Sequence, residues 1–190
     1  GYYIQNTKKN KVDLGKLGKY SLIKKMKKNN ALKNILNKLK RVPNEVKNDY
    51  INKIKYKTGV KISDKITNDY TLSWSNVKEM KDNKIDFGAH TLEHPILTNL
   101  NTEEIIKQIK KSKEIIESFS DDKVQYFAYP NGTCLDFNEK VIEILSKNNF
   151  KCAVTTIKGL VEKSQLPYKI NRISASVDFD NFKFRISGLY

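Results

Sequence analysis

The chain has 190 residues, of which 38% are hydrophobic and 30% are charged, and its formal net charge is +15. A chain of this length can bury the core of one globular domain, and no apolar run approaches the roughly 20 residues of a membrane-spanning helix. The pattern of a secretory signal peptide is also absent, but the chain begins at Gly1 and not at a methionine, so composition leaves the compartment open.

Basic residues are concentrated in the N-terminal part of the chain. Residues 8–57 contain 17 lysine and arginine residues against 3 aspartate and glutamate residues, a balance of +14, and the remaining residues contain 19 against 18. Two interpretations stay open. The lysines can form the solvated face of helices, or they can form a surface that attracts polyanions such as acidic cell-envelope polymers, anionic lipid headgroups or nucleic acid.

The first predicted elements are helices. Apolar residues recur at near-helical spacing among the lysines of residues 20–39, which predicts an amphipathic helix or a broken pair of helices. Pro43 is suited to the first turn of a second helix, and Gly59 is suited to its end. We therefore expect residues 1–70 to form a lysine-rich helical domain and residues 71–190 to form the core domain.

Strands and helices alternate from residue 72 onward. Ser73 is a candidate N-cap of a short helix, and residues 84–89 (KIDFGA) form a predicted strand. Asn101, followed three residues later by Glu104, matches a capping box in front of a long amphipathic helix.

The same alternation continues to residue 156. Residues 124–130 (VQYFAYP) and 150–156 (FKCAVTT) are predicted strands, and the helix between them has Asp136 as its expected N-cap. The order strand, helix, strand, helix, strand predicts a parallel sheet covered by helices, either as an open doubly wound sheet or as part of a barrel. Cys134 and Cys152 are too few for a disulfide framework, and we interpret Cys152 as a small buried hydrophobic residue.

The only two histidines of the chain, His90 and His94, directly follow the first of these predicted strands. Ligands of parallel α/β folds bind at the loops that follow the carboxyl ends of the strands. Two imidazoles at this spacing can face one metal ion, but they are also compatible with histidines that are only hydrogen-bonded in a loop. A hydrolytic zinc site normally has three protein ligands and a water, and neither Asp86 nor Glu93 is an obvious third ligand.

A second loop, with the sequence YPNG, follows the next predicted strand at residues 129–132. Asn131 and Gly132 favour a tight turn whose backbone N–H groups can face one point. By itself, such a turn is an ordinary connection between a strand and a helix. Beside a metal ion, one of these N–H groups would form an oxyanion site for acyl transfer.

Four segments resemble, in order and spacing, the polysaccharide deacetylase family of chitooligosaccharide-deacetylase-like carbohydrate esterases. They are residues 72–117, which include HTLEHP, and the segments FAYPNG, KCAVTTIKGL and YKINRIS. HTLEHP is similar to the most diagnostic motif of that family. The resemblance spans residues 72–173 and implies a distorted, incomplete (β/α) barrel, with the preceding helices as an insertion. It also implies a metal-dependent hydrolase that removes N-acetyl groups, and in some members O-acetyl groups, from sugars.

The resemblance further implies roles for individual residues. His90 and His94 match the two histidines that bind the divalent metal, for which zinc is expected, and Thr91 and Pro95 match residues that shape their loop. Asn131 matches the residue whose backbone N–H helps to hold the oxyanion. The other residues that we assign to the substrate site are Tyr129, Pro130, Gly132 and Arg172.

The chain departs from the family pattern in three places. No aspartate pair matches the catalytic base and third metal ligand, because Asp121 and Asp122 fall between a helix and a strand. Ala128 stands where many members have an arginine that orients the base, and the chain has no third histidine to act as a general acid. We expect the aspartate-bearing strand to precede Gly1, so that these 190 residues alone bind metal poorly and do not turn over substrate.

The expected function is therefore metal-dependent hydrolysis of the carbon–nitrogen bond of N-acetyl groups on a polysaccharide or glycan. The alternative is a non-catalytic carbohydrate- or polyanion-binding module that uses residues 8–57, including contact with an anionic membrane surface. Nucleic acid is disfavoured as a partner, because we expect no interleaved exposed aromatic residues in the basic segment and find no groove-reading motif there. The resemblance favours the cell envelope or secretion, although some members act inside the cell on nucleotide- or lipid-linked sugars.

Overall fold

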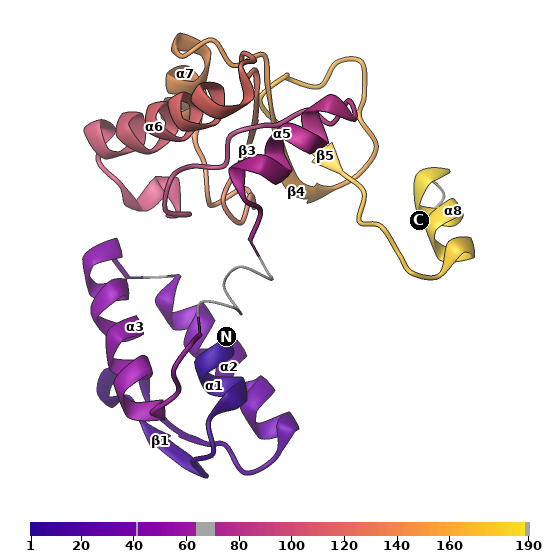
Figure 1. The fold of residues 1–190 in the computed structure, drawn as a ribbon. Helices are drawn as coiled ribbons and strands as arrows, with labels where there is room; N and C mark the ends of the chain where they lie inside the picture. The colour runs from indigo at the N-terminus through magenta and orange to yellow at the C-terminus, as the bar shows by residue number, and fades with distance from the viewer. Residues whose placement is uncertain (41, 64–70, 189–190) are drawn as a thin grey trace. The chain divides into compact units, whose positions relative to one another are not determined.

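The computed structural model describes residues 1–40, 42–63 and 71–188, which belong to two compact units, Gly1–Leu72 and Ser73–Tyr190 (Figure 1). Each unit has its own hydrophobic core. The division lies two residues from the boundary that the change of sequence pattern predicts.

The N-terminal unit packs helices against a small antiparallel hairpin. Its elements are α1 (Tyr2–Asn6), β1 (Lys11–Asp13), the 3₁₀ turn η1 (Gly15–Leu17), β2 (Lys19–Ser21), α2 (Lys25–Leu39) and α3 (Asn44–Thr58). The helical spacing predicted from residue 20 is wrong at its start, because Tyr20 lies in β2 and the N–H of Leu22 donates to the carbonyl of Asn10 at 2.7 Å. Leu22 directly follows this hairpin and is buried in the core of the N-terminal unit, and α2 begins only at Lys25.

The ends of α3 follow from its sequence. Pro43 is the N-cap, one position before the predicted first turn, with φ −55° and ψ 154°. Gly59 closes the helix in the left-handed region at φ 66°, and its N–H donates to the carbonyls of Lys55 and Tyr56. Glycine accepts this conformation without the Cβ clash that other residues meet, so the predicted end of the helix is confirmed.

The C-terminal unit contains α5 (Trp74–Asp82), η2 (Leu97–Asn99), α6 (Thr102–Ser120), β3 (Tyr126–Ala128), α7 (Glu139–Lys147), β4 (Cys152–Lys158), β5 (Ile170–Arg172) and α8 (Phe179–Ile186). The predicted N-cap at Ser73 and the predicted capping box at Asn101 are confirmed, since Asn101 exchanges hydrogen bonds with Glu104, and Ser73 also forms a capping box, with Asn76. The predicted cap of α7 is wrong. Asn138 caps that helix, because the Asp136 carboxylate instead accepts the N–H and hydroxyl of the preceding Thr133 at 2.8 and 2.5 Å.

The strands β3, β4 and β5 form a parallel sheet in that order, as the alternation of elements predicts. The strand predicted at residues 84–89 is wrong, because only Ala89 pairs with the sheet, through a parallel bridge to Phe127. The N–H of Ile85 still donates to the carbonyl of Met80 at the end of α5, and Lys84 has φ 64°, so the chain turns before it can extend. Among residues 71–188, these strands do not close into a barrel.

Helices α6 and α7 pack on the sheet over the core of the C-terminal unit (Figure 1). Ile105 and Ile109 of α6 and Val141 and Leu145 of α7 are buried against the strands, and the ring of Phe127 lies edge to face with that of Phe150. Burial of side chains of this size contributes about 1.5–3 kcal/mol each, so this core fixes the strands whose ends carry the two candidate loops.

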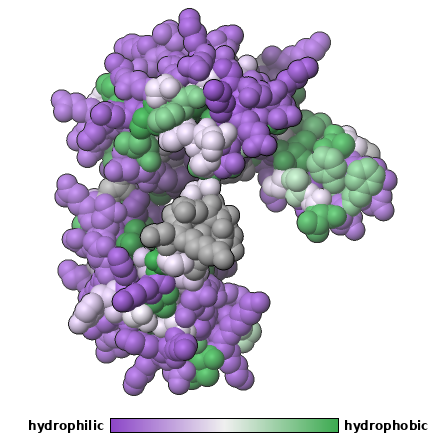
Figure 2. Space-filling model, viewed as in Figure 1, coloured by the Kyte–Doolittle hydropathy of each residue, from purple (hydrophilic) through white to green (hydrophobic). Residues whose placement is uncertain are grey.

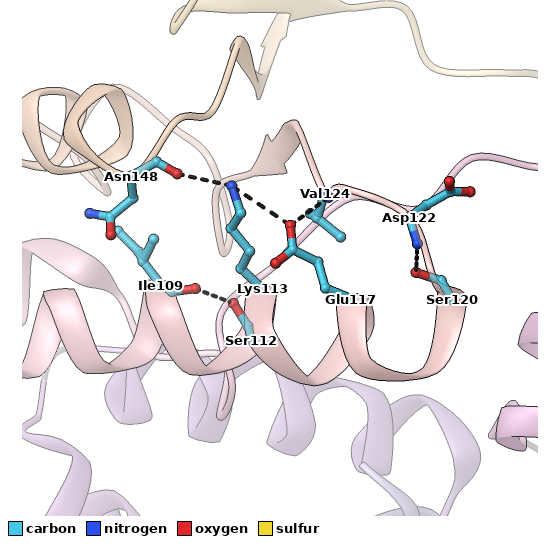
Figure 3. Close-up of polar contacts among 8 residues, drawn as sticks. All are labelled: Ile109, Ser112, Lys113, Glu117, Ser120, Asp122, Val124 and Asn148. Atoms are coloured by element: carbon cyan, nitrogen blue, oxygen red, sulfur yellow. Dashed lines mark hydrogen bonds and ion pairs between the residues drawn. The ribbon is translucent and has the colours of Figure 1, made fainter.

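Lys113 of α6 joins three elements (Figure 3). Its ammonium donates to the carbonyl of Asn148 at 3.0 Å, lies 3.9 Å from the carboxylate of Glu117 and stands over the Phe150 ring at 4.8 Å. The same Glu117 carboxylate accepts the N–H of Val124 at 2.9 Å, at the entrance of β3. This cluster therefore ties α6 to the end of α7 and to the start of β3.

The surface of the C-terminal unit carries both hydrophilic and hydrophobic residues. Figure 2 shows hydrophobic residues gathered over α8, which has no buried residue, with Phe179 69% and Phe184 52% exposed.

Cys134 and Cys152 are both free thiols. Across the part of the chain that the structure describes, no helix has the combination of length and apolar character needed to cross a membrane.

Candidate active site

Two loops leave the parallel sheet at the same edge. Ala89 donates its N–H to the carbonyl of Tyr126 at 2.8 Å, and the N–H of Ala128 donates to the carbonyl of Ala89 at 2.9 Å. Residues 90–95 follow Ala89 directly, and residues 129–132 follow the end of β3 directly. The pairing of Ala89 with β3 therefore brings the histidine loop and the YPNG loop together, as the sequence predicts.

The two histidines lie side by side. The ring centroids of His90 and His94 are 4.8 Å apart at an interplanar angle of 76°, and both side chains are exposed. Thr91 and His94 have φ values of 64° and 54°, and the N–H of His94 donates to the Thr91 hydroxyl at 3.1 Å. These two left-handed residues turn the chain back on itself, and the buried Pro95 then leads it into the core.

The ring of His90 is oriented by the next strand. Its Nδ1 lies 2.6 Å from the carbonyl oxygen of Ala128. A carbonyl can only accept, so this contact requires the proton on Nδ1, and in the neutral ring Nε2 is then the nitrogen with a lone pair. Histidines that bind metals commonly donate their other ring N–H to a carbonyl or carboxylate in this way, which fixes the ring and its tautomer.

Gln108 of α6 supports the histidine loop, and sequence reasoning missed it. Its side-chain oxygen accepts the N–H groups of Leu92 and Glu93 at 3.1 and 3.0 Å, and its nitrogen donates to the Glu93 carboxylate at 2.8 Å. The side chain is 6% exposed. The available signal was a glutamine next to Ile109, on the apolar stripe that the sequence assigns to the core face of this helix.

The YPNG loop forms the tight turn that Asn131 and Gly132 predict. Both residues have positive φ, 58° and 72°, and the N–H of Gly132 donates to the carbonyl of Pro130 at 2.8 Å. Thr156 of β4 holds the turn, because its hydroxyl donates to the carbonyl of Asn131 at 2.6 Å and its N–H donates to that of Gly132 at 2.8 Å. No acceptor for the Asn131 N–H is found among the described residues, so this group can meet a ligand.

The remaining predicted substrate residues have mainly structural contacts. The ring of Tyr129 is 1% exposed, stacks on Phe137 at 4.2 Å and donates its hydroxyl to the carbonyl of Tyr168 at 2.9 Å. The ring therefore faces the core, and the assignment of Tyr129 to the substrate site stays a prediction. Pro130 is also buried, and exposed Arg172 donates its Nε to the carbonyl of Thr155 at 2.5 Å, beside the threonine that holds the turn.

A divalent metal ion fits this edge of the sheet only in part. His90 and His94 supply two imidazoles of suitable proximity, and the Ala128 carbonyl defines the tautomer of the first. No cluster of three or more histidine, cysteine, aspartate or glutamate side chains that could hold a metal occurs among the described residues. The carboxylate of Asp122 lies 3.2 Å from the ammonium of Lys81, before the start of β3 and therefore at the end of the strand opposite to the histidine loop. A hydrolytic zinc site has three protein ligands, of which the described residues offer two candidates, His90 and His94.

Comparison with known proteins identifies the relatives of this arrangement. A family model described as polysaccharide deacetylase matches residues 49–153, beginning within α3 and ending in β4. The solved structure of the deacetylase PplD from Streptococcus pyogenes, in complex with acetate, is 27% identical with a TM-score of 0.51, and covers 54% of this chain and 44% of its own. BA0330 of Bacillus anthracis, described as a candidate polysaccharide deacetylase, is 27% identical with a TM-score of 0.54, over 61% of this chain and 37% of its own.

A curated relative extends the same pattern. YxkH of Bacillus subtilis (strain 168), described as a candidate polysaccharide deacetylase, is 24% identical over 115 residues, which are 60% of this chain and 40% of YxkH. The chain therefore spans less than half the length of each of these three relatives.

Proposed function

Because the chain belongs to the polysaccharide deacetylase family, we propose that it contributes to metal-dependent hydrolysis of N-acetyl groups on a polysaccharide or glycan. The observation that carries this proposal is the placement of His90 and His94 beside the Asn131 turn at one edge of a parallel sheet. We further propose that the three strands and the Ala89 bridge are part of the distorted, incomplete (β/α) barrel that the sequence resemblance implies.

Each residue of the site has a defined part in this proposal. His90 and His94 would hold a divalent ion, proposed to be zinc, together with a carboxylate supplied from outside these 190 residues. Such an ion supplies Lewis acidity and a bound water of lowered pKa. The N–H of Asn131 would donate to the oxygen of the acetamide as negative charge develops on it, which is the task of an oxyanion donor. The products are acetate and the free amine of the sugar.

The test compares this chain with one extended upstream of Gly1. Acetate release from a chitooligosaccharide is measured for both, together with zinc titration. We expect turnover and tight zinc binding only in the extended chain, because the base and third ligand are required for both. Equal activity in the two chains would refute the idea that the site is completed from outside. His90→Ala and His94→Ala in the extended chain are expected to lower zinc affinity, and Cys134→Ser, at an exposed position, is the control that should not.

A second candidate function rests on the N-terminal unit. Four lysines, Lys9, Lys11, Lys19 and Lys57, line an open cavity of about 550 Å³ beside the hairpin, with Asp13 as its acidic neighbour. We propose as the alternative that this unit binds a polyanion, without catalysis. The pairing of Lys19 with Asp13 at 3.1 Å and the bond from the Lys9 ammonium to the Lys57 carbonyl at 2.8 Å leave a surplus of positive charge there.

Salt-dependent binding separates this alternative from the first. Retention of the chain on heparin is measured as salt is raised, with the lysines of residues 8–57 then replaced by glutamine. A steep salt dependence that disappears with the replacement supports polyanion binding. Retention that is unchanged by the replacement would contradict it, as would an equal loss from replacing the 15 lysines of residues 73–190.

A further inference from the structure

In the segment between the two histidines, two backbone N–H groups donate hydrogen bonds to one buried side chain. Residues 91–94 have no regular secondary structure, and Leu92 and Glu93 both direct their N–H groups to the oxygen of Gln108. The two donors come from successive residues, so a single acceptor fixes the orientation of two adjoining peptide groups. Those peptide groups lie between the Cα atoms that carry His90 and His94.

The amide of Gln108 has the chemistry that this position requires. Its oxygen has two lone pairs and accepts two N–H groups, while its nitrogen donates to the Glu93 carboxylate at 2.8 Å. Glutamate could accept the two N–H groups but could not donate to a second carboxylate. A methionine of similar length could do neither. Because the side chain is 6% exposed, these bonds also satisfy polar atoms whose burial without partners would be unfavourable.

The surroundings make Gln108 rigid. It lies on α6, whose N-terminus is fixed by the Asn101 capping box, and its neighbours Ile105 and Ile109 are buried in the core. The loop therefore rests on a helix that packs on the sheet, in addition to the bridge that Ala89 makes with β3. A side chain held in this way can transmit the position of the helix to the loop.

We infer that Gln108 is a positioning residue, which sets the mutual orientation of the His90 and His94 rings through the Leu92 and Glu93 peptides. The inference rests on the proposed function for its consequence on metal affinity, but its structural part concerns the metal-free chain. The hydrogen bonds of Gln108 are to the N–H groups of Leu92 and Glu93 and to the Glu93 carboxylate, so its effect on the rings passes through the loop.

The test uses the full 190-residue chain with Gln108→Met, Gln108→Glu and the control Ser112→Ala. Ser112 is buried one turn further along α6 and donates only to the carbonyl of Ile109 of its own helix at 2.9 Å (Figure 3). The variant Ser112→Ala therefore reports the effect of removing a buried polar group from this helix without changing a contact of the histidine loop.

Two measurements are made on each variant. Without metal, amide hydrogen exchange of Leu92 and Glu93 and the ring-to-ring nuclear Overhauser effect of the histidines report the loop. With zinc, titration is followed through the ring proton signals of His90 and His94. We expect Gln108→Met to lose the amide protection and the ring contact, and to weaken zinc binding about 10-fold, the size of effect typical of residues that orient a ligand. Gln108→Glu keeps an acceptor for the two N–H groups but loses the bond to the Glu93 carboxylate, so its amide protection should lie between that of Gln108→Met and that of the unaltered chain. Ser112→Ala should leave all three measurements unchanged.

The outcomes separate the two proposals. Unchanged protection and ring contact in Gln108→Met would overturn the inference, and so would an equal loss in Ser112→Ala. If the unaltered chain, even when extended upstream, shows no response to zinc while Gln108→Met still loses the ring contact, the positioning role stands and the metal-dependent function falls.

Discussion

Replacement of Gly132 by alanine tests the close packing of the YPNG turn against β4. Gly132 has φ 72°, and a Cβ at this position would lie 2.9 Å from the backbone nitrogen of Thr156 and 3.2 Å from the carbonyl oxygen of Tyr129. Both neighbours are backbone atoms, so they cannot move aside as the end of a flexible side chain can. The turn must therefore shift away from β4 or adopt another conformation.

The expected cost has two parts. Placing alanine in the left-handed region costs about 1–2 kcal/mol. Moving the turn lengthens the 2.8 Å bond from the Thr156 N–H to the Gly132 carbonyl, and loss of such a bond costs about 1 kcal/mol. We expect Gly132→Ala to lower the free energy of unfolding by about 2–3 kcal/mol, which corresponds to a fall in Tm of about 5–10 °C for a chain of this size.

The assay is urea unfolding followed by residue-resolved NMR signals of each unit. Gly59→Ala is the matched control, because Gly59 has nearly the same φ, 66°, but no atom within 4 Å of the added Cβ. It should cost only the conformational part, about 1–2 kcal/mol. Equal losses in the two variants would show that the contact with β4 is not close, and would refute the reasoning.

Three further perturbations have defined results. Lys113→Met should cost about 1–2 kcal/mol of unfolding free energy, from the Asn148 bond and the Phe150 ring contact, whereas Lys110→Met on the exposed side of α6 should cost less than about 0.5 kcal/mol in the same urea titration. Burial raises the pKa of Tyr129 above its ordinary value of 10.0, with the charges of Tyr168 and Glu139 adding to the shift. Above pH 10 the native chain holds a proton on Tyr129 that the unfolded chain releases, so the contribution of Tyr129 to stability is complete below pH 10 and is lost as the pH rises further. Tyr129→Phe should flatten this decline of stability with pH, and an unchanged slope would contradict the prediction. Iodoacetamide should modify the exposed Cys134 before Cys152, whose thiol pKa is raised by desolvation, as peptide mass spectrometry would show.

Local signals in the sequence predicted the helices well. The capping boxes at Ser73 and Asn101 and the left-handed end at Gly59 each depend on residues within four positions, and the structure contains all three. One predicted N-cap, Asp136, was wrong. Asp136 and Asn138 are both good N-caps, and the hydrogen bonds of Asp136 with Thr133 leave the cap to Asn138.

Features that depend on distant contacts were not predictable in the same way. Residues 84–89 have a strand-like composition, but pairing requires a partner, and only Ala89 finds one in β3. The apolar residue Leu22 fits helical spacing, but it lies outside the helix, where it is buried and its N–H donates to the carbonyl of Asn10. For the site, the position of the histidine pair followed from the order of elements. The contacts of Gln108 with the loop 15 and 16 residues earlier did not, because side-chain direction on a packed helix is set by the tertiary fold.

The bridge at Ala89 has a consequence for how the molecule opens. Detaching the histidine loop from β3 breaks the two backbone hydrogen bonds of Ala89 and the contact of His90 Nδ1 with the Ala128 carbonyl, and leaves β3 paired with β4. We therefore expect the loop to open as a separate segment, at a free energy below that of global unfolding. A ligand that binds only the closed form would slow this exchange in proportion to its occupancy, so order in the loop measures how full the site is.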